Sequence, residues 1–98
     1  MIHSITSQEF RAIMRDPNLT IIDVREEDEF AAGAIEGAVN IPLSQIMREQ
    51  AELPEDKGQK YILYCRVGRR SMMACELMLE EGYGDLYNLE GGILEFQQ

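Results

Sequence analysis

The segment Cys65-Arg-Val-Gly-Arg-Arg-Ser71 places three arginines within five positions of one cysteine. The chain as a whole is acidic, since 18 Asp and Glu against 9 Lys and Arg give a net charge of −9. After Lys60 the basic residues are Arg66, Arg69 and Arg70 alone. Local positive charge favours a thiolate over a thiol and attracts an anion to the sulfur. The segment therefore predicts a nucleophilic cysteine that acts on a small anionic substrate.

The chain around Cys65 has the pattern of a connection between a strand and a helix. Residues 60–65 form an apolar run typical of a buried strand, and a helical pattern capped by Ser71 covers residues 71–81. Such a connection gathers free backbone N–H groups and the positive end of the helix dipole. Gly68 allows the connection to curl through a positive φ. Cysteine is often only a small buried apolar residue, but this combination favours a functional thiolate.

Strand and helix patterns alternate along the chain. Strands are expected at residues 19–24, 37–42, 60–65 and 86–89, and helices from Thr6 to before Pro17, at 26–32, from Ser44 to before Pro54, and at 71–81, with a turn at Gly91-Gly92. The alternation predicts an α/β fold of parallel strands with helices on both faces. Ligands bind such folds at the carboxyl ends of strands, where Asp23-Val24-Arg25 and the Cys65 loop would share one edge.

The length and composition predict a single domain over residues 1–98. The acidic net charge argues against nucleic acid and anionic membrane as partners. The sequence has no signal-peptide pattern and no apolar run near the roughly 18 residues of a membrane span. Its two cysteines form neither a disulfide framework nor a metal pair, and no metal-ligand cluster is evident. A reducing cytoplasm is the expected location.

Four segments resemble a known family. Cys65-x-x-Gly68-x-Arg70-Ser71 resembles the active-site loop of single-domain rhodaneses, the thiosulfate sulfurtransferases. Residues 22–25 (IDVR) resemble the Asp-x-Arg strand end of that family, residues 33–42 (GAIEGAVNIP) its G-H-I-P-G-A-x-N-I-P segment, and residues 89–92 (LEGG) its double glycine. The resemblance implies a rhodanese-like domain with a central parallel five-stranded sheet and helices on both faces.

The resemblance also implies a double displacement without a cofactor. The Cys65 thiolate would take sulfane sulfur from thiosulfate or another persulfide donor and release sulfite from thiosulfate. The acceptor would be cyanide, a cellular thiol or a protein. The cradle of the persulfide would be the loop that comprises Arg66, Val67, Gly68, Arg69, Arg70 and Ser71. Within it, Arg70 would orient toward the loop amides or the anion, and Arg66 and Arg69 would attract the donor.

Two other functions stay open at this point. The domain could be a sulfur-relay or regulatory binding module with little turnover of its own. It could also be a cysteine phosphatase or an arsenate reductase, because such enzymes share the fold and a cysteine–arginine loop. Those relatives have five residues between the cysteine and the arginine, whereas four separate Cys65 from Arg70. The shorter loop suits a single sulfur atom and favours sulfur transfer.

The remaining candidates have supporting or structural roles. Asp23 and Arg25 are expected to brace the edge of the site, with Arg25 reaching the active loop. Cys75 keeps helical spacing with Met72 and Leu79, so it is expected to pack as an apolar residue; the alternative is a resolving cysteine. Compared with the family, the C-terminal end is expected to be shortened, with Phe96 in place of a usual aromatic residue.

Overall fold

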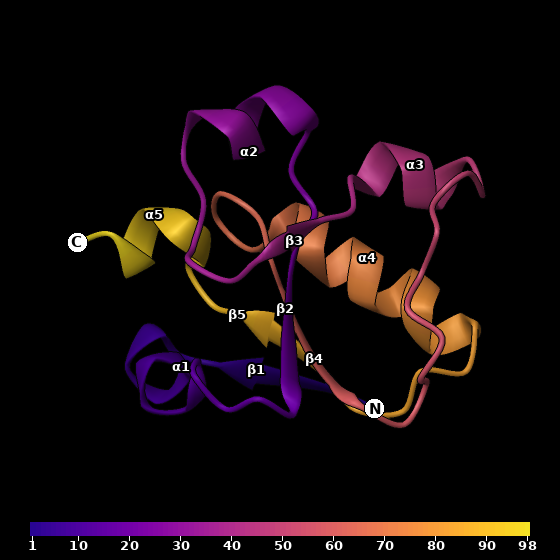
Figure 1. Cartoon of the computed structure of the whole chain (residues 1–98), viewed down its shortest axis with the longest axis horizontal. Coiled ribbons are helices and arrows are strands. Elements are labelled where there is room, and N and C mark those ends of the chain that lie inside the picture. The colour runs from indigo at the N-terminus through magenta and orange to yellow at the C-terminus, as the bar shows by residue number, and fades with distance from the viewer.

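The computed structural model describes all 98 residues and contains one central sheet (Figure 1). Its strands are β1 (Ile2–Ile5), β2 (Leu19–Asp23), β3 (Val39–Asn40), β4 (Lys60–Tyr64) and β5 (Leu86–Leu89). All pairings are parallel, and the strand order is β1-β5-β4-β2-β3. The predicted α/β fold with five parallel strands is thus confirmed.

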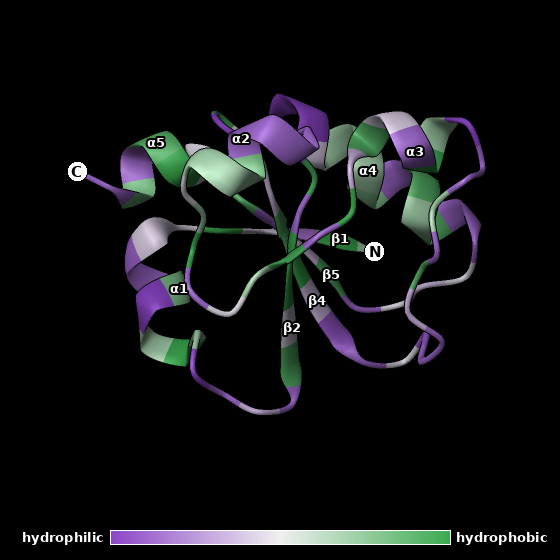
Figure 2. Ribbon diagram, turned by 45° about the horizontal axis from the view of Figure 1, so that its top comes forward, coloured by the Kyte–Doolittle hydropathy of each residue, from purple (hydrophilic) through white to green (hydrophobic).

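The helices cover both faces of this sheet. They are α1 (Ser7–Ile13), α2 (Glu27–Ala32), α3 (Leu43–Met47), α4 (Arg69–Glu80) and α5 (Gly92–Phe96). Helices α1 and α5 pack on one face, α3 and α4 on the other, and α2 lies beyond the carboxyl end of β2 (Figure 1). Helix α2 buries none of its residues, and Figure 2 colours its first turn hydrophilic. It is therefore held at the edge of the sheet by polar contacts.

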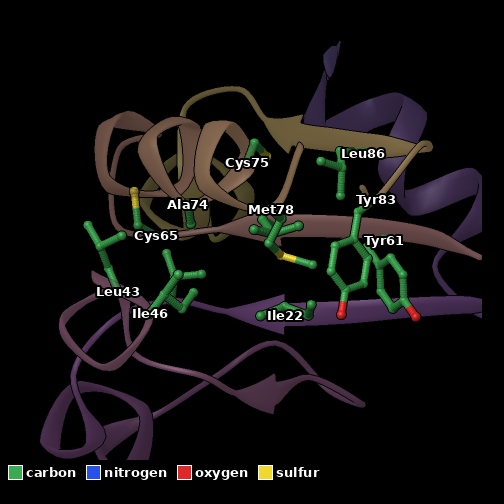
Figure 3. Close-up of a cluster of buried hydrophobic side chains, with 12 residues drawn as sticks. Ile22, Leu43, Ile46, Tyr61, Cys65, Ala74, Cys75, Met78, Tyr83 and Leu86 are labelled. Carbon is green, nitrogen blue, oxygen red and sulfur yellow. The ribbon is translucent and has the colours of Figure 1, made fainter. Parts of the chain in front are cut away.

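Strand β4 and Cys65, the residue directly after it, supply side chains to two hydrophobic cores, one on each face. Tyr61, Leu63 and Cys65 belong to the core beneath α3 and α4, whereas Ile62 and Tyr64 belong to the core beneath α1 and α5. This division follows from the period of two along a strand that is covered on both sides. Figure 3 shows the first core, with the Cys65 side chain at one end of it beneath α4.

The structure differs from the expected elements in several places. The helix expected from Ser44 to before Pro54 is the shorter α3, with Pro42 as its N-cap. The run at residues 2–5 is strand β1, which pairs with β5 alone and forms one edge of the sheet. The strand expected at 37–42 is reduced to β3, and α4 begins at Arg69 instead of Ser71. Instead of a simple turn at Gly91-Gly92, Gly91 is the N-cap of the short helix α5. No helix is long and apolar enough to cross a membrane.

Candidate active site

The sulfur of Cys65 lies inside the curled connection between β4 and α4. The backbone N–H of Gly68 donates to Sγ at 3.1 Å, and the backbone N–H of Ser71 donates at 3.4 Å. The Ser71 hydroxyl lies 3.4 Å from the same sulfur. Cys65 retains 1% of its exposure, so these donors replace water around it. The N-terminal turn of a 12-residue helix adds its partial positive charge at this point.

These donors decide the ionisation of Cys65. Burial by itself would raise the pKa of the Cys65 thiol, because desolvation disfavours the thiolate. Hydrogen bonds from the Ser71 side chain and from the backbone of Ser71, Gly68 and Val67 outweigh burial and lower that pKa below its ordinary value. The loop is thus a preformed site for a negatively charged sulfur.

Ser71 connects the sulfur to a residue that sequence reasoning missed, Asn88. The Ser71 hydroxyl donates to Asn88 Oδ1 at 2.5 Å, and Asn88 Nδ2 donates to the carbonyl of Gly68 at 3.2 Å. One hydroxyl proton cannot serve Asn88 and a Cys65 thiolate at once, so Ser71 can turn between them. The sequence expectation that Ser71 caps α4 is wrong. Gly68 is the N-cap, and Ser71 lies within the first turn, facing the sulfur.

Two glycines allow the loop to fit between α4 and α5. Gly68 has φ +104°, a left-handed conformation that favours glycine, as predicted. Gly92 has φ +59°, and a Cβ there would lie 2.4 Å from the carbonyl oxygens of both Cys65 and Arg66. The first turn of α5 can therefore approach the loop, where Ile93 N–H donates to the Cys65 carbonyl at 2.9 Å and Leu94 N–H to that of Arg66 at 3.1 Å. Helix α5 thus holds the Cys65 loop through the carbonyls of its first two residues.

The three arginines of the loop have different surroundings. Arg66 and Arg69 are exposed, and Val67 between them is 46% exposed. The Arg70 guanidinium forms a two-pronged ion pair with Glu29 of α2, at 2.7 and 3.1 Å. The hydrogen bonds that Glu29 accepts from Arg70 lower the pKa of Glu29 to about 2, so this carboxylate is charged at neutral pH. In the sequence Glu29 is one residue of an acidic run, residues 26–29, and nothing there indicates its contact with Arg70.

Asp23 and Arg25 form a buried brace at the adjacent strand end. The Arg25 guanidinium pairs with Asp23 at 2.7 Å and donates to the Gly33 carbonyl at 2.7 Å. The hydroxyl of Tyr64, the residue before Cys65, donates to Asp23 at 2.7 Å, while Asn40 Nδ2 donates to the carbonyls of both Asp23 and Arg25 at 2.9 Å. Arg25 thus holds the segment after β2, and its hydrogen bonds go there instead of to the Cys65 loop.

Cys75 belongs to the hydrophobic core. It is fully buried on α4, and its Sγ lies 3.8 Å from the Tyr87 carbonyl of β5. Burial raises the pKa of the Cys75 thiol to about 12, which keeps it protonated. In Figure 3 Cys65 lies at the loop end of the core, and Cys75 lies on the side of α4 toward β5. This environment fits the expected apolar role better than that of a resolving cysteine.

The aromatic residue near the C-terminus, Phe96, packs against the core beneath α1 and α5. The Phe96 ring meets Phe10 edge to face with centroids 5.5 Å apart, and the Arg11 guanidinium lies 4.0 Å from the centre of the Phe96 ring. These contacts tie α5 to α1. Backbone N–H groups of α5 also donate to the carbonyls of the Cys65 loop, so the packing of α5 on α1 helps to hold that loop in position.

Known proteins are similar to this chain in sequence and in fold. A sulfurtransferase of Allochromatium vinosum is 34% identical, with 96% of this chain aligned to 87% of that protein. A tRNA uridine(34) hydroxylase of Synechocystis is 33% identical over 94% of this chain but only 34% of its own length. The human single-domain sulfurtransferase structure superposes with a TM-score of 0.83 at 27% identity, covering 96% of this chain and 94% of that one. Residues 6–98 match the family described as the rhodanese-like domain. Because the family model matches nearly its whole length and its fold is that of the solved relative, this chain belongs to the rhodanese-like domain proteins.

Proposed function

We propose that this protein is a sulfurtransferase that carries sulfane sulfur on Cys65, with thiosulfate or a persulfide as donor. The observation that carries the proposal is the pair of backbone N–H groups, those of Gly68 and Ser71, that donate to Sγ. They favour the thiolate, which is the nucleophilic form of cysteine. Relatives named sulfurtransferase support sulfur transfer as the general activity.

The reaction has two displacement steps. In the first, the Cys65 thiolate attacks the outer sulfur of thiosulfate, a new S–S bond forms, and the bond within thiosulfate breaks with its electron pair leaving on sulfite. In the second, cyanide or a thiolate attacks the outer sulfur of the Cys65 persulfide, and the Cys65 thiolate is the leaving group. The covalent intermediate splits the transfer into two steps and needs no external oxidant or cofactor.

The remaining site residues have supporting roles in this proposal. The backbone N–H groups of the loop from Arg66 to Arg70, together with Ser71, surround the outer sulfur of the persulfide. The exposed Arg66 and Arg69 attract anionic donors. Asp23 and Arg25 hold the neighbouring strand end in place through their buried ion pair. We expect the reaction in a reducing cytoplasm, where thiol acceptors persist.

The direct test is thiocyanate formation from thiosulfate and cyanide. Wild-type protein should produce thiocyanate, and Cys65→Ala should abolish the activity because it removes the attacking sulfur. Cys75→Ala is the matched control and should retain turnover, provided that both variants unfold at a temperature close to that of wild type. Turnover that persists in Cys65→Ala would refute the assignment.

A sulfur-relay module is a second candidate, because the loop presents exposed Arg66, Val67 and Arg69 as a contact surface for a partner protein. Cys65 itself is 1% exposed, so the partner would have to insert its acceptor thiol into the loop. Mass spectrometry would then find a stable single-sulfur adduct on Cys65 that cyanide removes slowly and the partner removes fast. Fast removal by cyanide would instead favour an enzyme with free turnover.

A phosphatase or arsenate reductase is the weakest of the three functions. Four residues separate Cys65 from Arg70, and the guanidinium of Arg70 is engaged by Glu29. We therefore expect neither hydrolysis of an aryl phosphate nor reduction of arsenate.

A further inference from the structure

The ion pair between Glu29 and Arg70 lies next to the cysteine loop and joins two elements. Arg70 is in the first turn of α4, directly before Ser71, whose N–H and hydroxyl face the Cys65 sulfur. Glu29 is in the first turn of α2 and also accepts a hydrogen bond from the Glu26 N–H at 3.1 Å. The guanidinium donates two hydrogen bonds to Glu29, which hold its planar fork in one orientation.

This ion pair changes the charge that a donor meets. A free Arg70 would offer a full positive charge and a fork of N–H donors to the oxygens of a sulfonate group. Paired with Glu29, the same arginine is neutralised, and Glu26 lies close enough to add further negative potential at Arg70. A donor that uses Arg70 must displace Glu29 and then faces an unpaired carboxylate.

We propose that Glu29 is a specificity-determining residue that disfavours doubly charged donors at Cys65. The inference rests on the proposed sulfurtransferase function and narrows its donor class. The preferred donors carry a single negative charge, as persulfides and thiosulfonates do, whereas the thiosulfate dianion is disfavoured. Glu29 need not touch the reacting sulfur, because it acts through Arg70.

Two donors that react in the same way isolate this effect. Thiosulfate and benzenethiosulfonate both transfer an outer sulfur to the thiolate and release a sulfur oxyanion, sulfite or benzenesulfinate. They differ by one unit of negative charge on the donor. The ratio of their kcat/KM values, measured with saturating cyanide as the acceptor, therefore reports charge selection separately from the overall competence of Cys65.

The decisive variant is Glu29→Gln, with Glu27→Gln as the matched control. Glutamine keeps an oxygen that can accept from the Glu26 N–H but cannot neutralise Arg70. Glu27→Gln removes the same charge from the same helical turn, and Glu27 makes no ion pair. We expect Glu29→Gln to raise the thiosulfate to thiosulfonate ratio by about tenfold, the effect of one charge-assisted hydrogen bond in a partly exposed site. Glu27→Gln should change the ratio by about twofold or less, because exposed charges are screened.

A double-mutant comparison tests whether Arg70 transmits the effect. In an Arg70→Gln background the further change Glu29→Gln should no longer raise the ratio, since the group that it releases is absent. An equal rise in that background, or the same rise in Glu27→Gln, would overturn the inference. An unchanged ratio in Glu29→Gln would overturn it as well.

Failure of this inference can be separated from failure of the proposed function. Mass spectrometry of wild type and Glu29→Gln after exposure to each donor reports the single-sulfur adduct on Cys65. If neither donor forms the adduct in either protein, the sulfurtransferase assignment fails and Glu29 has no donor to select. If the adduct forms with both donors and the kinetic ratio does not move, the assignment stands and only the role of Glu29 is refuted.

Discussion

Cys65 and Cys75 are both buried, yet their environments affect the thiol in opposite directions. Cys65 is 1% exposed and Cys75 is fully buried, so burial raises the pKa in both. Around Cys65, hydrogen-bond donors at the start of α4 reverse that effect and lower the pKa. Around Cys75 the neighbours are apolar, the contact with the Tyr87 carbonyl offers only an acceptor, and the pKa rises to about 12.

The difference teaches that the position on a helix decides what a buried cysteine can do. Cys65 precedes α4, where backbone N–H groups have no partner within the helix and point at the sulfur. Cys75 lies within α4, where the N–H groups are used by the helix itself. Composition around the two residues matters less than which backbone groups are free.

The largest effect that tests this comparison is the ionisation of each thiol. Thiolate absorbance should be titrated in Cys75→Ala, which retains Cys65, and in Cys65→Ala, which retains Cys75, with the double variant subtracted as background. We expect Cys65 to ionise at a lower pH than free cysteine in the same buffer, and Cys75 to stay protonated up to about pH 12. Similar midpoints for the two cysteines would remove the basis of the comparison.

The direction of the pH dependence follows from the same shift. A lowered pKa means that Cys65 is still a thiolate at pH values where a free cysteine is protonated. Sulfur transfer to Cys65 should therefore stay constant as the pH falls toward its folded pKa and decline only below that value. A decline that begins at the pKa of free cysteine would show that the loop does not favour the thiolate.

A side chain at Gly92 should disrupt Cys65 while sparing the surroundings of Cys75. In Gly92→Ala the new Cβ would meet the Cys65 and Arg66 carbonyls at 2.4 Å, in a backbone conformation that disfavours alanine. We expect the free energy of unfolding to fall by about 2 kcal/mol or more, together with loss of sulfur transfer. Chemical denaturation and the thiocyanate assay measure the two effects.

Gly84→Ala is the control for that substitution, because nothing lies within 4 Å of a Cβ at Gly84 and its φ is not in the left-handed region. It should change the free energy of unfolding by less than about 1 kcal/mol. An equal loss in both variants would point to a general effect of alanine instead of a contact with the loop.

A smaller effect is expected from Ser71→Ala, which removes one donor and leaves the backbone donors in place. The pKa of Cys65 should rise, and kcat/KM near neutral pH should fall by about tenfold, the usual size for one hydrogen bond to a charged group. Ser44→Ala is a suitable comparison, since Ser44 also lies in the first turn of a helix and bonds to Glu26 away from the sulfur. Wild-type activity in Ser71→Ala would place the stabilisation of the thiolate in the backbone alone.

The fold and the loop were predictable because each is encoded locally. Apolar runs predicted β2, β4 and β5, and the residue types from Cys65 to Ser71 predicted the curled loop with backbone N–H groups directed at the sulfur. Strand β1 was not predicted, because only Ile5 of its four residues is buried and because it lies at the edge of the sheet, where it pairs with β5 alone. A short edge strand has little hydrophobic signal.

The missed site residues depend on partners far away in the sequence. Asn88 is one polar residue in a short strand, and its role follows only from the register that places it opposite Leu63 of β4. Glu29 is one of four consecutive acidic residues, and nothing in the sequence distinguishes the one that meets Arg70. The start of α4 at Arg69 follows from the left-handed Gly68, which turns the chain earlier than Ser71 would.

The donors around Cys65 have a consequence for the order of events in catalysis. The N–H groups of Gly68 and Ser71 face the sulfur of the resting cysteine. If Cys65 carries sulfur, the resting thiolate and the loaded persulfide are both monoanions, so the loop holds the same net charge in both states. Neither half of the cycle then requires a proton to arrive or leave, and no acid or base has to be rearranged between them. The lone histidine, His3, stacks on Tyr87 at the sheet edge. On the proposed mechanism the charge of the site is the same in both halves of the cycle, and we expect the access of donors and acceptors to the sulfur to set the rate.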